Sequence, residues 1–109
     1  MSLSEKKCLA CEGGVAALSA TEVSILLEKL VDWKTTDDHQ KITKTFHFKN
    51  YYQTMSFVNA IAWISNHDNH HPDLSVHYNK CIVEYTTHAI NGLSENDFIC
   101  AAKIDRLLS

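Results

Sequence analysis

The sequence predicts an α+β fold: a four-stranded antiparallel sheet with three helices on one face, in the order α-β-β-α-β-β-α. Three observations lead to this prediction. Residues 19–22 and 94–97 carry the same helix-start signal, and apolar residues alternate with polar ones in a segment around residues 42–48. Two pairs of strand-like segments are each joined by a short turn. Strands joined so tightly pair antiparallel, and helices must cover the apolar face of the resulting sheet.

The first helix is predicted to begin after Ser19 and to end near Asp32. Ser19 can cap the free amides of the first turn, while Glu22 reaches back to the amide of the cap. Leu18 and Val23 have the spacing of a hydrophobic staple across this start. One face of the helix then carries Val23, Leu26, Leu27, Leu30 and Val31 at helical spacing.

The first pair of strands is predicted between residues 33 and 49. A short strand at 33–36 leads through the turn-forming pair Asp37-Asp38 into a longer strand with a period of two. His39 and His47 are expected on the solvent face or at a strand edge. The alternation places Ile42, Phe46 and Phe48 on the core face and Thr43, Thr45 and His47 on the solvent face.

The second helix is predicted over residues 51–67, capped by Asn50. Apolar residues, among them Phe57, Trp63 and Ile64, lie on more than one side of it. A helix of this kind is either deeply buried or part of an interface between subunits. We expect Trp63 to be a packing residue and the chain to self-associate.

The second pair of strands is predicted at 74–78 and 81–88, joined by a two-residue turn at Asn79-Lys80, where asparagine tolerates a left-handed conformation. Ser94 and Asp97 then repeat the cap-and-return pattern, and Leu93 with Phe98 repeats the staple. The last helix is expected to continue to about Leu108.

Length and charge exclude several classes of function. A chain of 109 residues is predicted to form one domain. A net charge of −3 without a basic block argues against nucleic-acid binding and against binding to a membrane surface. No segment approaches the roughly 18 apolar residues of a transmembrane helix. We expect a flexible leader over 1–18, a single domain over 19–109, and a cytoplasmic location with reduced cysteines.

The leader contains Cys8-x-x-Cys11, for which three interpretations stay open: metal capture, redox sensing, or a reduced and mobile segment. A complete structural zinc site needs four ligands, and the chain has no second pair of this kind. Cys81 and Cys100 lie in apolar segments and are expected to be small core residues.

Four histidines, His67, His70, His71 and His77, fall within residues 67–77. His67 and His71 have the i, i+4 spacing of a helical metal site, but His71 precedes Pro72, which disfavours helix there. No nucleophile motif or phosphate-binding loop is present. Histidine titrates near neutral pH, so general acid–base catalysis by this cluster remains, beside the alternative that these side chains are simply solvated.

Four motifs together resemble the pterin-4a-carbinolamine dehydratase family: His70-His71-Pro72, Tyr78-Asn79-Lys80, Thr87-His88 and Gly92-Leu93-Ser94-Glu95-x-Asp97. The resemblance extends over residues 19–108 in the order of elements. It implies a four-stranded antiparallel sheet with helices on one face and assembly as a homodimer or homotetramer. It also implies dehydration of the 4a-hydroxytetrahydropterin released by aromatic amino-acid hydroxylases to quinonoid dihydropterin, without cofactor or metal.

The resemblance also assigns residues by position. His70, His71 and His88 correspond to the three active-site histidines, and Asp97 corresponds to an aspartate of the family, although capping alone also accounts for Asp97. The pterin pocket is expected to include Asn69, Pro72, Thr86, Thr87 and Ala89 beside the histidines. Two positions depart from animal members: Asn66 replaces a glutamate and Leu74 a tryptophan. Any role of that glutamate is either absent here or taken by Asp68 or Asp73 as a supporting carboxylate. The alternative is a non-catalytic, self-associating regulatory module, since some relatives act as dimerisation cofactors of a transcription factor.

Overall fold

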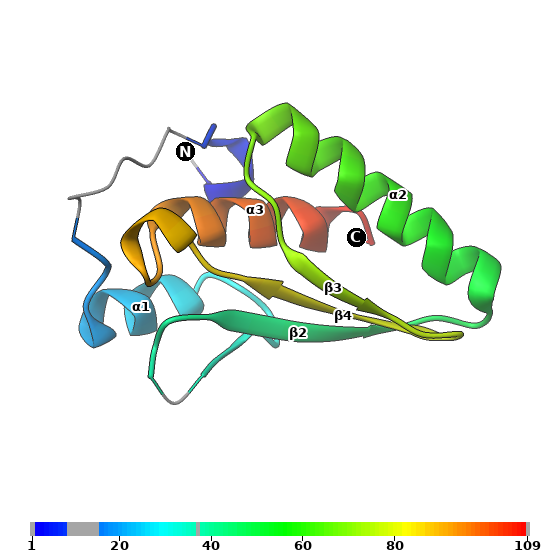
Figure 1. Cartoon of the computed structure of the whole chain (residues 1–109), viewed down its shortest axis with the longest axis horizontal. Helices are drawn as coiled ribbons and strands as arrows, with labels where there is room; N and C mark the ends of the chain where they lie inside the picture. Colours follow the sequence, from blue (N-terminus) through cyan, green and yellow to red (C-terminus); the bar gives the residue numbers. More distant parts are fainter. Residues whose placement is uncertain (1, 9–15, 37, 109) are drawn as a thin grey trace.

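The computed structural model describes residues 2–8, 16–36 and 38–108. A 3-10 helix, η1 (Leu3–Glu5), precedes α1 (Ala20–Leu27), β1 (Lys34–Thr35), β2 (Ile42–His47) and α2 (Tyr51–Asp68). The chain continues through β3 (Asp73–Val76), β4 (Lys80–Tyr85), a second 3-10 helix η2 (His88–Ile90) and α3 (Glu95–Arg106). This is the predicted order, and the α+β class is confirmed (Figure 1).

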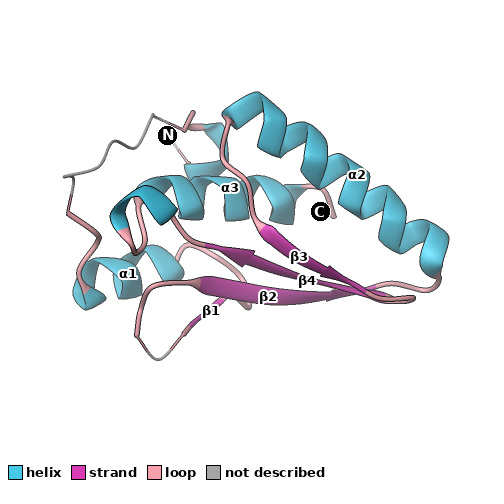
Figure 2. Ribbon diagram, in the orientation of Figure 1, coloured by secondary structure: helices cyan, strands magenta, loops and turns pink. Residues whose placement is uncertain are grey.

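The four strands form one antiparallel sheet in the order β1-β2-β4-β3. The two predicted hairpins supply the outer pairs, and β2 and β4 pair at the centre in a register that runs from Ile42 opposite Tyr85 to His47 opposite Lys80. Helices α2 and α3 lie over one face, and α1 contacts α3 near one end of the sheet (Figure 2). The helices therefore leave the second face of the sheet open.

The core lies between the sheet and α3. Side chains of alternate strand residues meet those of the helix, as the period-two pattern predicts. Each large side chain that is fully buried contributes roughly 1.5–3 kcal/mol to stability. The largest of them are Tyr85, Phe98, Ile42, Ile61, Leu93 and Ile104.

Both predicted capping boxes are present. Ser19 and Glu22 bond reciprocally at the start of α1, and Ser94 and Asp97 do so at the start of α3. The Asn50 side chain accepts from the amide of Gln53 at the start of α2. These hydrogen bonds satisfy amides that have no partner within the helix. Because they join residues only three positions apart, the starts of the helices could be predicted from the sequence.

Three boundaries differ from the prediction. Helix α1 ends at Leu27 and is followed by turns, and Asp32 has a left-handed backbone with a φ of 62°. Val31 therefore lies outside the helix and is 66% exposed rather than packed. The turn between β3 and β4 lies one residue earlier than predicted, because the amide of His77 donates to the carbonyl of Lys80. Asn79 does not have the predicted left-handed conformation. Strand β4 ends at Tyr85, so His88 lies on η2 and not on a strand.

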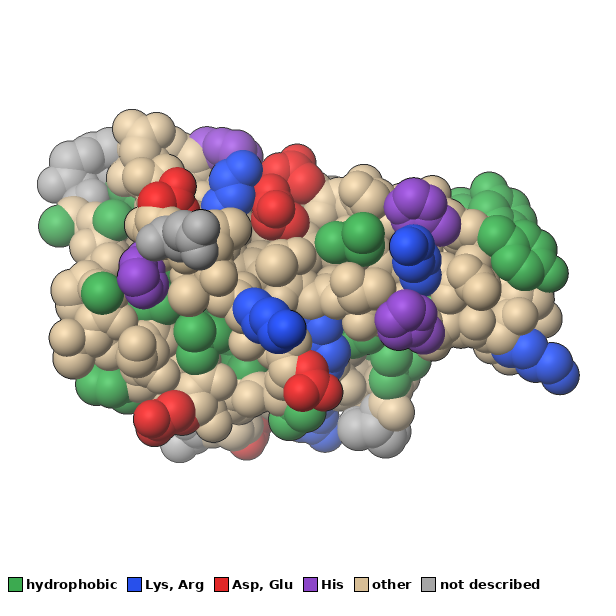
Figure 3. Space-filling view, turned by 90° about the horizontal axis from the view of Figure 1, so that it is seen from below, with side chains coloured by type: hydrophobic (Ala, Val, Ile, Leu, Met, Phe, Trp, Pro, Cys, Tyr) green, Lys and Arg blue, Asp and Glu red, His purple; other side chains and the backbone are tan. Residues whose placement is uncertain are grey.

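Helix α2 exposes part of its apolar surface. Trp63, expected to be a packing residue, is 76% exposed because it lies on the outer side of the helix. Tyr51 and Tyr52 near its start are also exposed, and Tyr51 stacks against Tyr78 of the hairpin with the ring centroids 6.5 Å apart. Seen from the open side of the sheet, hydrophobic side chains gather at one end of the molecule (Figure 3).

The first residues of the chain do not behave as a free leader. Leu3 of η1 is only 7% exposed, because it packs against α3, and Cys8 lies against Cys100 of the same helix. The prediction of a loosely held segment is therefore wrong for residues 2–8. Cys11, the second cysteine of the predicted pair, lies outside the described residues. In the described part of the chain, no helix has the length and apolar character needed to cross a membrane.

Candidate active site

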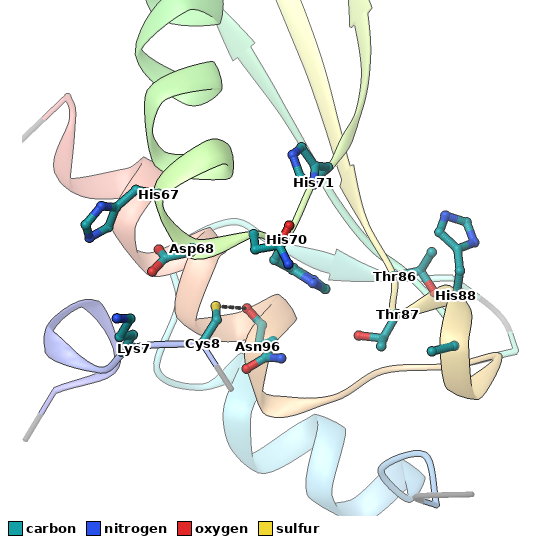
Figure 4. Close-up of a pocket in the computed structure, with 12 residues that line it drawn as sticks. Lys7, Cys8, His67, Asp68, His70, His71, Thr86, Thr87, His88 and Asn96 are labelled. Atoms are coloured by element: carbon teal, nitrogen blue, oxygen red, sulfur yellow. Dashed lines mark hydrogen bonds between the residues drawn. The ribbon is translucent and has the colours of Figure 1, made fainter. Parts of the chain in front are cut away.

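A cavity of about 470 Å³ lies where the end of α2, the segment after β4 and the start of α3 meet, with the N-terminal segment beside them (Figure 4). Most of the side chains around it are polar or titratable. Its lining consists of Lys7, Cys8, His67, Asp68, Asn69, His70, His71, Thr86, Thr87, His88, Ala89 and Asn96.

The end of α2 delivers the histidine pair to this cavity. Asn69 has a left-handed backbone (φ 51°, ψ 42°), and the amides of both Asn69 and His70 donate to the carbonyl of Ser65. This left-handed C-cap stops the helix before His71 and Pro72, as the proline predicts. The two neighbours consequently differ in environment: His70 is half-buried, and His71 is exposed at the cavity.

His70 is held from two sides. Its Nε2 lies 2.6 Å from Oδ1 of Asp97, and its ring stacks on Tyr85 with centroids 5.7 Å apart and planes at 7°. Burial by itself would lower the pKa of His70, but the hydrogen bond and the negative charge of Asp97 outweigh it and hold that pKa above its ordinary value. Since Nε2 is bound to Asp97, Nδ1 is the ring nitrogen that remains for a ligand.

Asp97 has more than the capping role that the sequence suggested. It is fully buried at the start of α3, and its Oδ2 accepts from the amide of Ser94 at 3.0 Å and from the hydroxyl of Thr87 at 2.8 Å. Its Oδ1 is the atom that meets His70. One carboxylate therefore starts a helix, anchors the segment after β4 and orients the imidazole.

The segment from Thr86 to Gly92 positions the third histidine. The Thr86 hydroxyl donates to the carbonyl of Gln40, and Thr87 and Gly92 bridge through their backbones. Gly92 is needed for close approach, because a Cβ added there would lie 2.7 Å from the Cβ of Ala17. His88 begins η2 and is exposed at the rim of the cavity.

Most of the residues predicted from sequence come together here. All three histidines line the cavity, and so do Asn69, Thr86, Thr87 and Ala89. Pro72 is not part of the lining, and Asp73 lies exposed on β3, away from it. Asn66, at the position of the animal glutamate, is exposed on α2 and also outside the lining; the carboxylate present here is that of Asp68.

The pocket predicted from the sequence did not include Lys7, Cys8, His67, Asp68 or Asn96, which also line the cavity. Cys8 belonged to the presumed leader, and only the packing of that segment on α3 brings it to the cavity. Its thiol lies 3.3 Å from that of Cys100. The hydrogen bond between them lowers the pKa of Cys8, against the effect of burial, and raises that of Cys100, where burial acts in the same direction.

The comparison with known protein families decides the family. The model described as pterin 4 alpha carbinolamine dehydratase matches residues 16–107. The chain belongs to this family. A protein of Nitrosomonas eutropha, provisionally named pterin-4-alpha-carbinolamine dehydratase, is 60% identical over 107 residues, which are 97% of this chain and 93% of that protein.

Two solved structures share the fold. The crystal structure of a transcriptional coactivator/pterin dehydratase from Brucella melitensis superposes with a TM-score of 0.81 at 29% identity, covering 85% of this dehydratase-family chain and 99% of the other. A pterin dehydratase-like protein described as a RuBisCO assembly factor in the alpha-carboxysome has a TM-score of 0.62 at 23% identity, covering 71% of this chain and 89% of that one. The second likeness concerns the fold alone.

Proposed function

We propose that this protein dehydrates 4a-hydroxytetrahydropterin to quinonoid dihydropterin and water, with His70 and His88 as its acid–base groups and His71 positioning the substrate. The observation that carries the proposal is the cavity in which the carboxylate-bound His70 lies together with His71 and His88, in a chain of this family. The resemblance of the sequence motifs and the names of the relatives point to the same reaction.

The reaction needs little beyond two proton transfers. In a 4a-carbinolamine, the hydroxyl group and N5 share one carbon, so the nitrogen lone pair can expel the oxygen. An acid protonates the departing hydroxyl, a base removes the N5 proton, and the products are the quinonoid dihydropterin and one water molecule. Two imidazoles of opposite protonation state can supply both transfers near neutral pH.

Asp97 gives His70 a defined role in this scheme. A carboxylate at Nε2 keeps the proton on that nitrogen and presents the Nδ1 lone pair to the substrate, as the orienting carboxylate does in other acid–base sites. The raised pKa of His70 makes it a better base than a free imidazole. His88, which is exposed on η2, then supplies the complementary proton transfer. His71 positions the pterin and its 4a-hydroxyl group.

The substrate links the protein to a second enzyme. A 4a-hydroxytetrahydropterin arises when an aromatic amino-acid hydroxylase uses a reduced pterin, so we place the protein in the recycling of that cofactor. A small self-associating dehydratase of this kind needs no permanent contact with the hydroxylase, because the carbinolamine is released into solution.

The test is a coupled assay. The 4a-carbinolamine is generated with an aromatic amino-acid hydroxylase, and formation of quinonoid dihydropterin is followed with and without the protein. We expect acceleration that persists in EDTA and falls at least about 100-fold in His88→Ala, the usual effect of losing an acid–base group. His77→Ala is the matched control, since His77 is exposed and outside the cavity lining. No acceleration by the unmodified protein would refute the proposal.

A second candidate function is a non-catalytic regulatory module that acts through protein contacts. It is supported by the name of the Brucella relative, which includes transcriptional coactivator, and by the exposed Trp63 and Tyr52 on α2. The same assay separates the two functions, because a purely regulatory module would leave the rate of dehydration at its uncatalysed value.

A further inference from the structure

Three metal-ligating side chains meet beside the cavity but belong to three different segments. Cys8 comes from the N-terminal segment, Asp68 from the last turn of α2 and Cys100 from α3. One ligand atom of each, two thiol sulfurs and a carboxylate oxygen, lies within 4.8 Å of the other two. Figure 4 shows Cys8 and Asp68 on neighbouring sides of this part of the cavity.

The carboxylate of Asp68 is sheltered and only half satisfied. Its side chain is 1% exposed, and Oδ2 accepts from the ammonium group of Lys103 at 2.7 Å. The other oxygen, Oδ1, is buried and has no hydrogen-bond partner among the described residues. A buried carboxylate oxygen without a partner is costly, and it marks a place where an ion or water is expected.

We propose that Cys8, Asp68 and Cys100 bind one Zn²⁺ ion. Sulfur and carboxylate ligands are those that zinc prefers, and a compact group of three leaves the fourth position of a tetrahedral site for water. Since Cys8 and Asp68 both line the cavity, the fourth position is reached from it. Binding releases the two thiol protons, and the three negative ligands are then balanced by the ion and the charge of Lys103.

A disulfide between Cys8 and Cys100 is the competing interpretation of the close sulfurs. Both cysteines are free, with the sulfurs 3.3 Å apart. A disulfide would use the thiols and leave the buried Oδ1 of Asp68 without a partner, whereas zinc uses all three side chains. The metal therefore accounts for one observation that the disulfide does not.

The proposed ion would stabilise the fold, and its binding does not rest on the proposed dehydration. None of its ligands is one of the three histidines of the proposed active site. By joining the N-terminal segment to α2 and α3, it would fix one wall of the cavity. Zinc should therefore stabilise the folded chain without being required for proton transfer.

The first experiment titrates the full-length, reduced chain with Co²⁺, which reports thiolate ligands by charge-transfer absorption, and then displaces it with Zn²⁺. We expect one equivalent per chain with thiolate absorption. Free Zn²⁺ at about 100 times its dissociation constant should raise the melting temperature by about 10 °C. Absence of thiolate absorption in the unmodified chain would overturn the proposal.

Single substitutions identify the ligands. Cys8→Ala and Cys100→Ala should each lower the Zn²⁺ affinity at least about 100-fold, and Asp68→Asn should lower it at least about tenfold while keeping the thiolate absorption. Cys81→Ala is the matched control, because Cys81 is also a buried cysteine but lies on β4. Circular dichroism checks that each variant is folded.

Two outcomes refute the assignment of ligands. Thiolate absorption that is unchanged in Cys100→Ala would show that Cys8 binds the ion without α3. A Cys8–Cys100 disulfide, detected by mass spectrometry in protein kept under reductant and unable to take up Co²⁺, would show that the close sulfurs serve a covalent bond instead.

Discussion

Replacing Asp97 with asparagine tests whether this carboxylate controls the protonation of His70. The substitution keeps the size and shape of the side chain, and the amide oxygen can still accept from Ser94 or Thr87. It removes the negative charge opposite Nε2 of His70, however, and can place an N–H group there instead. His70 would then carry its neutral proton on Nδ1, the nitrogen that we propose as the base, and could no longer accept a proton there.

The size of the effect follows from the geometry. The Nε2–Oδ1 distance is 2.6 Å, and the side chains of His70 and Asp97 are 12% and 0% exposed, so solvent screens the pair only weakly. Hydrogen bonds to charged groups contribute about 1.5–3 kcal/mol. If the same amount is lost from the transition state, kcat/KM falls roughly 10- to 100-fold at neutral pH.

The coupled carbinolamine assay, run as a function of pH, measures this loss. Because Asp97 raises the pKa of His70, the limb of the pH profile that reports His70 should move to lower pH in Asp97→Asn. Nitrogen NMR should show the change of tautomer directly. Asp73→Asn is the control, since Asp73 is exposed and does not line the cavity. If Asp97→Asn keeps the position of the limb and a rate within about twofold of the unmodified chain, the reasoning is wrong.

Two further predictions concern stability and assembly. Because the folded-state pKa of His70 lies above its unfolded value of 6.5, its bond to Asp97 stabilises the fold fully below about pH 6.5, and that contribution is lost as the pH rises through the folded pKa. The difference in free energy of unfolding between the unmodified chain and Asp97→Asn, from urea titrations, should therefore shrink between pH 6 and pH 9; a difference that grows would contradict this. Trp63→Ser tests the proposed self-association: it should leave the stability of the isolated chain nearly unchanged, since Trp63 is 76% exposed, but should lower the mass measured by light scattering; an unchanged mass would refute a role of Trp63 in self-association.

Features with local causes were predictable from the sequence. The boxes at Ser19 and Ser94 involve residues three apart, and Pro72 acts on the residue directly before it, so helix starts and the end of α2 could be inferred without a structure. The boundaries that differ depend on the surrounding chain. The strand prediction ran to residue 88, but Thr86 bonds to Gln40 and ends the ladder at Tyr85.

The contacts that define the candidate site lie far apart in the sequence. His70 and Asp97 are separated by 27 positions, and Cys8 and Cys100 by 92. Sequence motifs identified the histidines and the aspartate separately. Only the packing of α3 against the end of α2 brings His70 and Asp97 within hydrogen-bond distance. For Cys8 the sequence indicated a loose segment, because nothing near it in the chain shows that Leu3 is buried against α3.

The double engagement of Asp97 links the fold to the chemistry. The same carboxylate satisfies the amide that begins α3 and holds the imidazole at the cavity, so removing the whole side-chain group disturbs both functions at once. A truncation such as Asp97→Ala would remove a cap worth about 1 kcal/mol together with the charge, and its loss of activity would mix unfolding with chemistry. Asp97→Asn separates them, because asparagine retains an acceptor for the cap while losing the charge. A variant that stays folded and loses only the proton-transfer function would therefore show that His70 depends on the charge of Asp97 and not merely on the helix that Asp97 begins.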